Sequence, residues 1–232
     1  MASISFDDVT VAVPAADGDV VILKDISATL TEHRVALIGG NGSGKSTLAR
    51  LVNGLVVPSS GKVTVDGLDV AEDGPAVRRQ VGFVFTNPAA QLVMPTVAED
   101  VALSLRRQFS DKSARARRTA EVLEEFGLGG HAGSSVHSLS GGQQQILALA
   151  GVLATEPSIV VADEPTTLLD LRNTAIVAER LFGLAQQLVL VTHDLALARR
   201  CDRVLVIADG RLDFDGEPEA AVDHYRHSVT SP

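Results

Sequence analysis

The stretch Gly-Gly-Asn-Gly-Ser-Gly-Lys-Ser at positions 39–46 fits the pattern G-x-x-x-x-G-K-[ST]. A short apolar run, Arg34–Ile38, leads into it, and residues with helical spacing, Thr47–Leu55, follow it. Glycines let backbone N–H groups turn inward around an anion, and the start of a helix adds positive charge at the same point. A strand, a glycine loop and a helix in this order predict the phosphate-binding loop of an α/β core, rather than a merely flexible loop.

The residue types in this loop fit the chemistry of a nucleotide and its metal ion. The Lys45 ammonium can reach β- and γ-phosphates, and the Ser46 hydroxyl can ligate Mg²⁺. We therefore expect a nucleotide and Mg²⁺ to bind here. The residues expected to contact the nucleotide are Gly39, Gly40, Asn41, Gly42, Ser43, Gly44, Lys45, Ser46 and Thr47.

Two further apolar runs end in residues with catalytic chemistry. Ile159–Ala162 ends in Asp163 and Glu164. Asp163 is placed to hold the Mg²⁺ shell, and Glu164 to polarise an attacking water as a general base. The alternative is a strand that ends in a solvated acidic pair. His193 follows Leu188–Val191 and would lie on the ligand-binding edge of a parallel sheet, where it can contact the γ-phosphate and orient the water. The alternative is a surface histidine in a loop.

Between these motifs lies Leu-Ser-Gly-Gly-Gln, at positions 139–143. Ser140, Gly141 and Gly142 precede a run with helical spacing, Gln143–Ala154. They offer N–H groups and a helix N-terminus to an anion. Serine and glycine are also good cap residues, so a plain helix cap is the alternative.

Composition limits the partners that this chain can have. It carries 29 acidic and 20 basic residues, a net charge of −9, which argues against duplex nucleic acid and against direct docking on anionic lipid. No apolar run has the length of a membrane span, and the N-terminus lacks the regions of a signal peptide. A role at a membrane would therefore need a partner protein. The one cysteine, Cys201, suits a reducing cytosol, and the basic run Lys112–Arg118 is interpreted as a solvated face.

Strand signals alternate with helical ones near both ends of the chain, and helical spacing dominates the middle. This pattern predicts an α/β core that carries an inserted helical lobe. We expect one domain over residues 1–232, with its core in 1–85 and 155–232 and its lobe in 86–154. The remaining expected strands are Ile4–Val13, Val20–Leu23, Lys62–Val65, Leu188–Thr192, Val204–Ala208 and Arg211–Phe214. The remaining expected helices are Thr96–Arg107, Ala114–Phe126, Asn173–Gln187 and Leu195–Arg200, with a loop at Gly127–Ser135 and a frayed tail after Val229.

Taken together, the order of these motifs resembles that of the ATP-binding cassette (ABC) family of ATPases, over nearly the whole chain. The resemblance implies an α/β P-loop NTPase (RecA-like) core with N-terminal antiparallel β-strands and an inserted helical subdomain. It also implies ATP as the nucleotide and His193 as the family's switch histidine. Two cassettes of the family pair head to tail, so that each ATP lies between the phosphate loop of one and the signature loop of the other. The signature-loop and D-loop contacts implied in this way are Ser140, Gly141, Gly142, Gln143 and Asp170.

A closer resemblance is to the cassettes of energy-coupling-factor (ECF) importers of vitamins and metal ions. It rests on residues 41–55, NGSGKSTLARLVNGL, on 87–93, NPAAQLV, and on 163–173, DEPTTLLDLRN. The last segment is most similar to the biotin-uptake member. The resemblance implies a second cassette, a transmembrane coupling subunit and a substrate-binding membrane subunit, which would hold this chain at the cytoplasmic face of the membrane. The segment from Thr86 to about Arg107 would touch the membrane subunit.

Two positions depart from the family pattern. The family usually has a glutamine that senses Mg²⁺ and the γ-phosphate where this chain has Thr86, and a tyrosine that stacks on adenine near Val13. Threonine offers a hydroxyl with a shorter reach, and valine gives apolar contact without a π face. We keep Thr86 as a candidate nucleotide and metal contact and Val13 as a candidate base contact. We expect modest ATP affinity and slow turnover without partners, and a gain in metal-dependent hydrolysis for Thr86→Gln.

The residues and the resemblance together predict an ATP-hydrolysing subunit. It would power uptake of a small solute, a vitamin such as biotin or a transition metal ion, through separate membrane subunits. The alternatives are the ATPase of another ABC importer or exporter, an inert regulatory cassette, and a soluble cassette that acts on DNA or ribosomes. The last class usually has long coiled-coil insertions or a second cassette with basic segments, and this chain shows neither.

Overall fold

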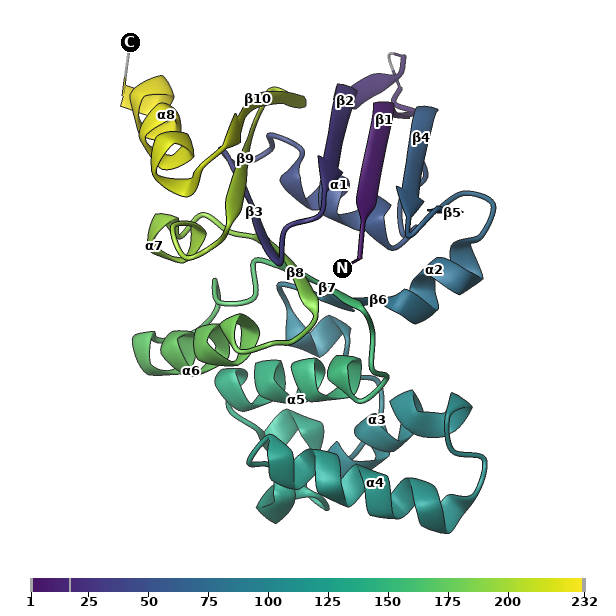
Figure 1. The fold of residues 1–232 in the computed structure, drawn as a ribbon. Coiled ribbons are helices and arrows are strands. Elements are labelled where there is room, and N and C mark those ends of the chain that lie inside the picture. Colours follow the sequence, from purple (N-terminus) through teal and green to yellow (C-terminus); the bar gives the residue numbers. More distant parts are fainter. Residues whose placement is uncertain (1, 17, 231–232) are drawn as a thin grey trace. The chain divides into compact units, whose positions relative to one another are not determined.

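The computed structural model describes residues 2–16 and 18–230 and divides the chain into two compact units. The first unit comprises Met1–Val81, Ser158–Glu164 and Leu184–Pro232, and the second comprises Gly82–Pro157 and Pro165–Gly183. The predicted lobe ended at residue 154. In the structure the second unit also takes in Pro165–Gly183, which the sequence pattern placed in the core. This segment contains the helix Leu171–Phe182, labelled α6 in Figure 1.

An antiparallel sheet in the first unit has the strand order β2-β1-β4-β5. Its central strand β1 buries Ile4, Phe6, Val9 and Val11, since alternate side chains of a strand point to the same face. The register of β1 against β2 shifts between Phe6 and Val9, and Asp8 adopts a positive φ of 49° there. The strands are β1 (Ile4–Val13), β2 (Val20–Leu30), β4 (Ser60–Val65) and β5 (Leu68–Asp69).

A second sheet has the order β10-β9-β3-β8-β7-β6. β3 pairs in parallel with β8 and β9, and β7 pairs in parallel with β8, whereas β9 and β10 form an antiparallel hairpin. Every residue of β7 and β8 is buried, as expected for strands covered on both faces. The strands are β3 (Arg34–Ile38), β6 (Val81–Val84), β7 (Ile159–Asp163), β8 (Gln187–Val191), β9 (Arg203–Ala208) and β10 (Arg211–Gly216).

The helices of the first unit are α1 (Lys45–Val52), α2 (Gly74–Gln80), α7 (Leu195–Ala198) and α8 (Pro218–Thr230). Helix α1 begins two residues before the predicted start and ends three before the predicted end, because Gly44 acts as its N-cap and Gly54 turns the chain with a φ of 67°. Leu55, which the spacing placed at the end of the predicted helix, therefore lies outside it and is 48% exposed. The spacing did not predict α2 and α8.

The second unit is helical around one apolar core. Its helices are α3 (Val97–Ser104), α4 (Lys112–Glu125), α5 (Gly141–Leu153) and α6 (Leu171–Phe182), with short 3₁₀ turns η1 (Pro88–Ala90), η2 (Leu105–Arg107), η3 (Gly129–His131) and η4 (Val136–Ser138). The core contains Val97, Val101, Leu105, Val122, Leu123, Leu128, Leu139 and Leu147. Among the described residues, no helix of either unit is long and apolar enough to cross a bilayer.

Several boundaries differ from the predicted ones for local reasons. Gly183 ends α6 at Phe182, so Gln187 begins β8 and does not end a helix. The predicted loop Gly127–Ser135 contains the turn η3. Helix α8 is still helical at Thr230, and the rest of the predicted frayed tail, residues 231–232, lies outside the described residues.

Candidate nucleotide-binding site

The parallel strands bring three of the predicted motifs to one edge of the first unit. The glycine loop follows β3, Asp163 ends β7, and His193 follows β8. Val191 pairs with both Leu37 and Asp163, so the ends of the three strands lie at the same level. The carboxyl edge of a parallel sheet is the usual place for a ligand site.

The glycine loop has a backbone that only glycine fits at two positions. Gly39 has a φ of 148°, and a Cβ there would lie 2.1 Å from the Ile207 carbonyl oxygen. Gly44 has a φ of 104°, and a Cβ there would lie 2.6 Å from the Leu23 side chain. Gly44 is also the N-cap of α1 and makes no side-chain cap bond. The first N–H groups of α1 are therefore left for an anion.

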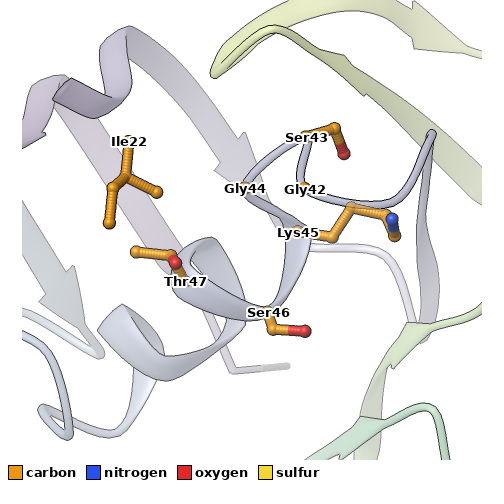
Figure 2. A pocket seen from close by; sticks show the side chains of 7 residues that line it. All are labelled: Ile22, Gly42, Ser43, Gly44, Lys45, Ser46 and Thr47. Carbon is orange, nitrogen blue, oxygen red and sulfur yellow. The ribbon is translucent and has the colours of Figure 1, made fainter. Parts of the chain in front are cut away.

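A pocket of about 300 Å³ lies over this loop and is lined by Ile22, Gly42, Ser43, Gly44, Lys45, Ser46 and Thr47 (Figure 2). The Ser43 hydroxyl is buried and has no hydrogen-bond partner among the residues that the structure describes. A buried polar group without a partner calls for an explanation. An uncapped helix start and an orphaned hydroxyl beside an open pocket fit a bound phosphate chain.

Lys45 lies folded against its own loop. Its ammonium Nζ donates to the carbonyl oxygens of Gly39 at 2.9 Å and Gly40 at 2.7 Å. Burial lowers the pKa of Lys45, and the nearby Glu164 and Asp163 carboxylates act in the opposite direction. The carbonyl oxygens of Gly39 and Gly40 keep the Lys45 ammonium beside the loop, and phosphate oxygens could replace them as its hydrogen-bond acceptors.

Ser46 and Asp163 form a pair of hard oxygen groups. The Ser46 hydroxyl donates to Asp163 Oδ1 at 2.8 Å, and Arg50 Nη2 lies 3.6 Å from Asp163 Oδ2. Burial raises the pKa of Asp163, with the Ser46 hydrogen bond acting against it. The described residues contain no cluster of three or more His, Cys, Asp or Glu that could hold a metal. Two oxygens fit Mg²⁺, which uses few protein ligands and completes its shell with water and phosphates.

Glu164 and His193 lie in hydrogen-bond contact. His193 Nδ1 is 2.7 Å from Glu164 Oε2. Glu164 has a φ of 51°, unusual for a residue with a side chain, and its backbone N–H donates to the Val191 carbonyl. Strained conformations of this kind gather at functional sites. The pair, predicted from two separate strands, is brought together by the pairing of β7 with β8.

In the second unit, the Leu139–Gln143 segment forms a helix cap. Ser140 is the N-cap of α5, and its Oγ accepts from the Gln143 backbone N–H at 3.3 Å. Gln143 Oε1 accepts from the Ser140 backbone N–H at 2.9 Å, which completes a capping box. Helix α5 therefore begins at Gly141, two residues before the predicted start. The segment thus forms the helix cap that was the alternative interpretation. This cap does not use the backbone N–H groups of Gly141 and Gly142, which lie at the helix start.

Helix α6 touches the signature segment within the second unit. A Cβ on Gly142 would lie 2.3 Å from the Asn173 side chain, so only glycine fits there. Asp170 caps α6, since its Oδ1 accepts from the Asn173 backbone N–H at 2.8 Å and its Oδ2 from the Asn173 side chain at 3.1 Å. Thr86, half-buried after β6, lies in this second unit as well.

The candidate base contact Val13 and the pocket residue Ile22 lie on neighbouring strands of the antiparallel sheet. Val13 ends β1 and is 40% exposed, and it is not among the residues that line the pocket. Ile22 lines the pocket (Figure 2), although it was not among the candidate site residues predicted from the sequence. Gly210 donates to the Ser43 carbonyl and accepts from Lys24, which brings β2 beside the loop. Asp209 and Gly210 form the turn between β9 and β10, so this hairpin end lies against β2 and the glycine loop.

Known proteins with this arrangement are numerous. The chain matches the family described as ABC transporter over residues 23–167. It is 42% identical to the biotin transport ATP-binding protein BioM of Rhizobium etli, over 89% of this chain and 92% of the relative. It is 41% identical to the energy-coupling factor transporter ATP-binding protein EcfA1 of Halalkalibacterium halodurans, over 86% of this chain and 73% of that one.

A solved structure has the same fold. The dimeric post-hydrolysis state of the ATP-binding cassette MJ0796, bound to ADP and Pi, superimposes with a TM-score of 0.83 at 29% identity. The match covers 93% of this chain and 98% of that one. With the phosphate loop, the acidic strand end and the family match in agreement, the chain belongs to the ABC transporter family and is an ABC transporter ATPase that binds ATP.

Proposed function

We propose that this chain is the ATP-hydrolysing subunit of an ECF-type importer, in which its hydrolysis powers the uptake of a small solute. The observation that carries the proposal is the joint placement of Lys45, Asp163 and the Glu164–His193 pair at one sheet edge. The similarity to EcfA1, an energy-coupling factor transporter ATP-binding protein, supports the ECF type.

The geometry of the first unit supports hydrolysis by water. Glu164 takes a proton from the water whose oxygen attacks the γ-phosphorus, and the bond to the β–γ bridging oxygen breaks with its electron pair leaving on ADP. His193, whose Nδ1 lies 2.7 Å from Glu164 Oε2, orients this carboxylate and would contact the γ-phosphate. Lys45 neutralises β- and γ-phosphate charge. Ser46 and Asp163 would hold Mg²⁺, which would supply charge stabilisation on the phosphate oxygens.

The partners that we propose are a second cassette and two membrane subunits. MJ0796, which this chain resembles at 29% identity, is a dimer in its structure with ADP and Pi. In a head-to-tail pair, Ser140, Gly141, Gly142 and Gln143 would face the nucleotide on the partner's phosphate loop, with Asp170 beside it. A transmembrane coupling subunit and a substrate-binding membrane subunit would place the pair at the cytoplasmic face of the membrane.

For the solute we propose a vitamin, with biotin first and a transition metal ion second. The similarity to BioM, a biotin transport ATP-binding protein, favours biotin. The binding specificity would lie in the membrane subunit and not in this chain.

Uptake measurements with the chain in its cellular context test this proposal. Cells that lack the chain are complemented with wild-type or Lys45→Ala protein, and uptake of labelled biotin and of nickel or cobalt ions is compared. We expect biotin uptake with the wild type only, since Lys45 binds the phosphates. Metal-ion uptake alone would favour the second solute. If uptake of both solutes is the same with wild-type and Lys45→Ala protein, an ECF role is contradicted. Purification of the chain with its membrane subunits would then identify another importer or exporter.

The departure at Thr86 gives a separate test of the site. We propose that Thr86→Gln raises Mg²⁺-dependent hydrolysis, because the longer amide reaches further toward the metal and the γ-phosphate. ATPase activity is measured over a Mg²⁺ titration, with Thr86→Ser as the variant that keeps only the hydroxyl. No change, or a loss, in the glutamine variant would count against Thr86 as a metal and phosphate contact.

A further inference from the structure

The Gln143 side chain has both ends of its amide engaged. Oε1 accepts from the Ser140 backbone N–H at 2.9 Å. Nε2 lies 3.1 Å from Nε2 of His131, in the turn η3. One glutamine thus joins the start of helix α5 to a histidine twelve positions earlier in the chain.

The hydrogen-bond donors can be assigned from these contacts. A backbone N–H can only donate, so the Gln143 atom that faces Ser140 must be the amide oxygen. The other end of the amide is then the NH₂ group, which can only donate. His131 Nε2 must therefore accept, with its lone pair toward Gln143 and the ring proton on Nδ1.

Backbone hydrogen bonds hold both the N–H and the carbonyl group of His131. Its own N–H donates to the Leu128 carbonyl at 2.9 Å, and its carbonyl accepts from Ser134 at 2.8 Å. Leu128 is 1% exposed within the core of the second unit. The following residues are held against the start of α3, since Ala98 donates to Ala132 at 2.9 Å and Val97 to Ser134 at 3.1 Å.

We propose that His131 is a positioning residue for the signature loop. By accepting from Gln143, it orients the amide that holds the Ser140 N–H, and so fixes Ser140 at the start of α5. The proposal rests on the proposed role of Ser140 toward the nucleotide of a facing cassette. His131 touches neither the nucleotide nor the reacting atoms in this account, and it acts through Gln143.

Three substitutions separate positioning from general folding. His131→Leu removes the acceptor. His131→Gln places an amide oxygen at about the reach of Nε2, so it keeps an acceptor. His137→Leu is the matched control, because His137 is an exposed histidine nearby whose ring makes no hydrogen bond within the described residues.

The first measurement is amide hydrogen exchange at Ser140 in the ligand-free chain, which needs no activity. We expect faster exchange in His131→Leu and near-wild-type exchange in His131→Gln and His137→Leu. The second is steady-state ATP hydrolysis together with ATP binding to the monomer. His131→Leu should lower kcat about fivefold, the effect of one lost hydrogen bond of about 1 kcal/mol. Monomer binding should stay unchanged, because the phosphate loop lies in the other unit.

A double-mutant cycle with Gln143→Leu shows whether His131 acts through Gln143. We expect that His131→Leu causes no further loss of kcat in a chain that already carries Gln143→Leu. Additive losses, an equal loss in His131→Leu and His131→Gln, or unchanged Ser140 exchange in His131→Leu would each overturn the proposal. If wild-type protein does not hydrolyse ATP, the proposed function fails, while the exchange measurement still decides the role of His131 in the loop. If His131→Leu does not fold, the comparison of His131→Gln with His131→Lys, which has only donors, replaces it: equal Ser140 exchange in these two would refute the idea.

Discussion

Both units contain a glycine loop that leads into a helix, and the two loops satisfy their polar groups in opposite ways. In the first unit, Gly44 begins α1 without a side-chain cap, and the buried Ser43 hydroxyl has no hydrogen-bond partner within the described part of the chain. In the second, Ser140 and Gln143 cap α5 reciprocally. The phosphate loop thus keeps a buried hydroxyl without a partner among the described residues, whereas in the signature loop a capping box pairs the N–H groups of Ser140 and Gln143. A ligand that takes the N–H group of Ser140 or Gln143 must replace a bond that the chain makes for itself.

This difference has a consequence for how the two loops would respond to ATP. A loop with unsatisfied donors gains hydrogen bonds from the first ligand that reaches it, so a monomer can bind nucleotide there. A self-capped loop gains less from the same ligand, because it exchanges one set of bonds for another. We therefore expect nucleotide to bind the phosphate loop first, and the signature loop to engage it only when two cassettes close.

The largest expected effect separates the roles of the two loops. Lys45→Ala should abolish ATP binding by the monomer, whereas Ser140→Arg should leave monomer binding intact and abolish hydrolysis. Mixing the two variants should restore roughly a quarter of wild-type hydrolysis, since random pairing gives mixed dimers with one intact site each. The measurement is ATP hydrolysis of each variant alone and of the mixture. No recovery on mixing would mean that both loops serve the nucleotide of their own chain.

The next effect concerns chemistry in the first unit alone. Glu164→Gln should lower hydrolysis by about 10²–10⁴-fold, the range for loss of a general base, without loss of ATP binding. The variant should accumulate as an ATP-bound dimer, measured by sedimentation at saturating ATP. A variant that stays monomeric under these conditions would contradict closure of the cassette pair by ATP.

A smaller effect tests the comparison of the two loops in the absence of ligand. Ser140→Ala removes a helix N-cap and should lower the free energy of unfolding by about 1 kcal/mol. Ser43→Ala removes a buried hydroxyl without a partner and should leave stability unchanged or raise it by up to about 1 kcal/mol. Denaturant unfolding of the ligand-free variants measures both. An equal decrease in the free energy of unfolding in the two variants would show that the Ser43 hydroxyl stabilises its loop as much as the Ser140 cap does.

The smallest effect concerns the buried carboxyl of the first unit. Burial raises the pKa of Asp163 above its ordinary 3.8, so the folded state holds this proton more tightly than the unfolded state. The free energy of unfolding therefore falls as pH rises from below 3.8 through the folded-state pKa, and the loss persists at neutral pH. Asp163→Asn should remove this loss and raise the ligand-free Tm by about 2 °C. A lower Tm at pH 7 would show that the Ser46 and Arg50 contacts outweigh the cost of burial.

The sequence by itself determined the motifs and the class of fold, because those signals are local. The glycine pattern of 39–46, the apolar runs before Asp163 and His193, and the Ser140–Gln143 cap are each set by neighbours in the chain. The strands that carry the site were therefore predicted within one or two residues. Helix ends were predicted less well, because Gly44 and Gly183 act through backbone geometry that apolar spacing does not reveal.

Only the tertiary structure decided which residues meet. Glu164 contacts His193 because β7 pairs with β8. Ile22 lines the nucleotide pocket because the Asp209-Gly210 turn joins β2 to the phosphate loop. His131 reaches Gln143 because a 3₁₀ turn folds the predicted loop back on α5. These contacts join residues far apart in the chain, and their energy comes from burial and from hydrogen bonds that exist only once the elements have packed.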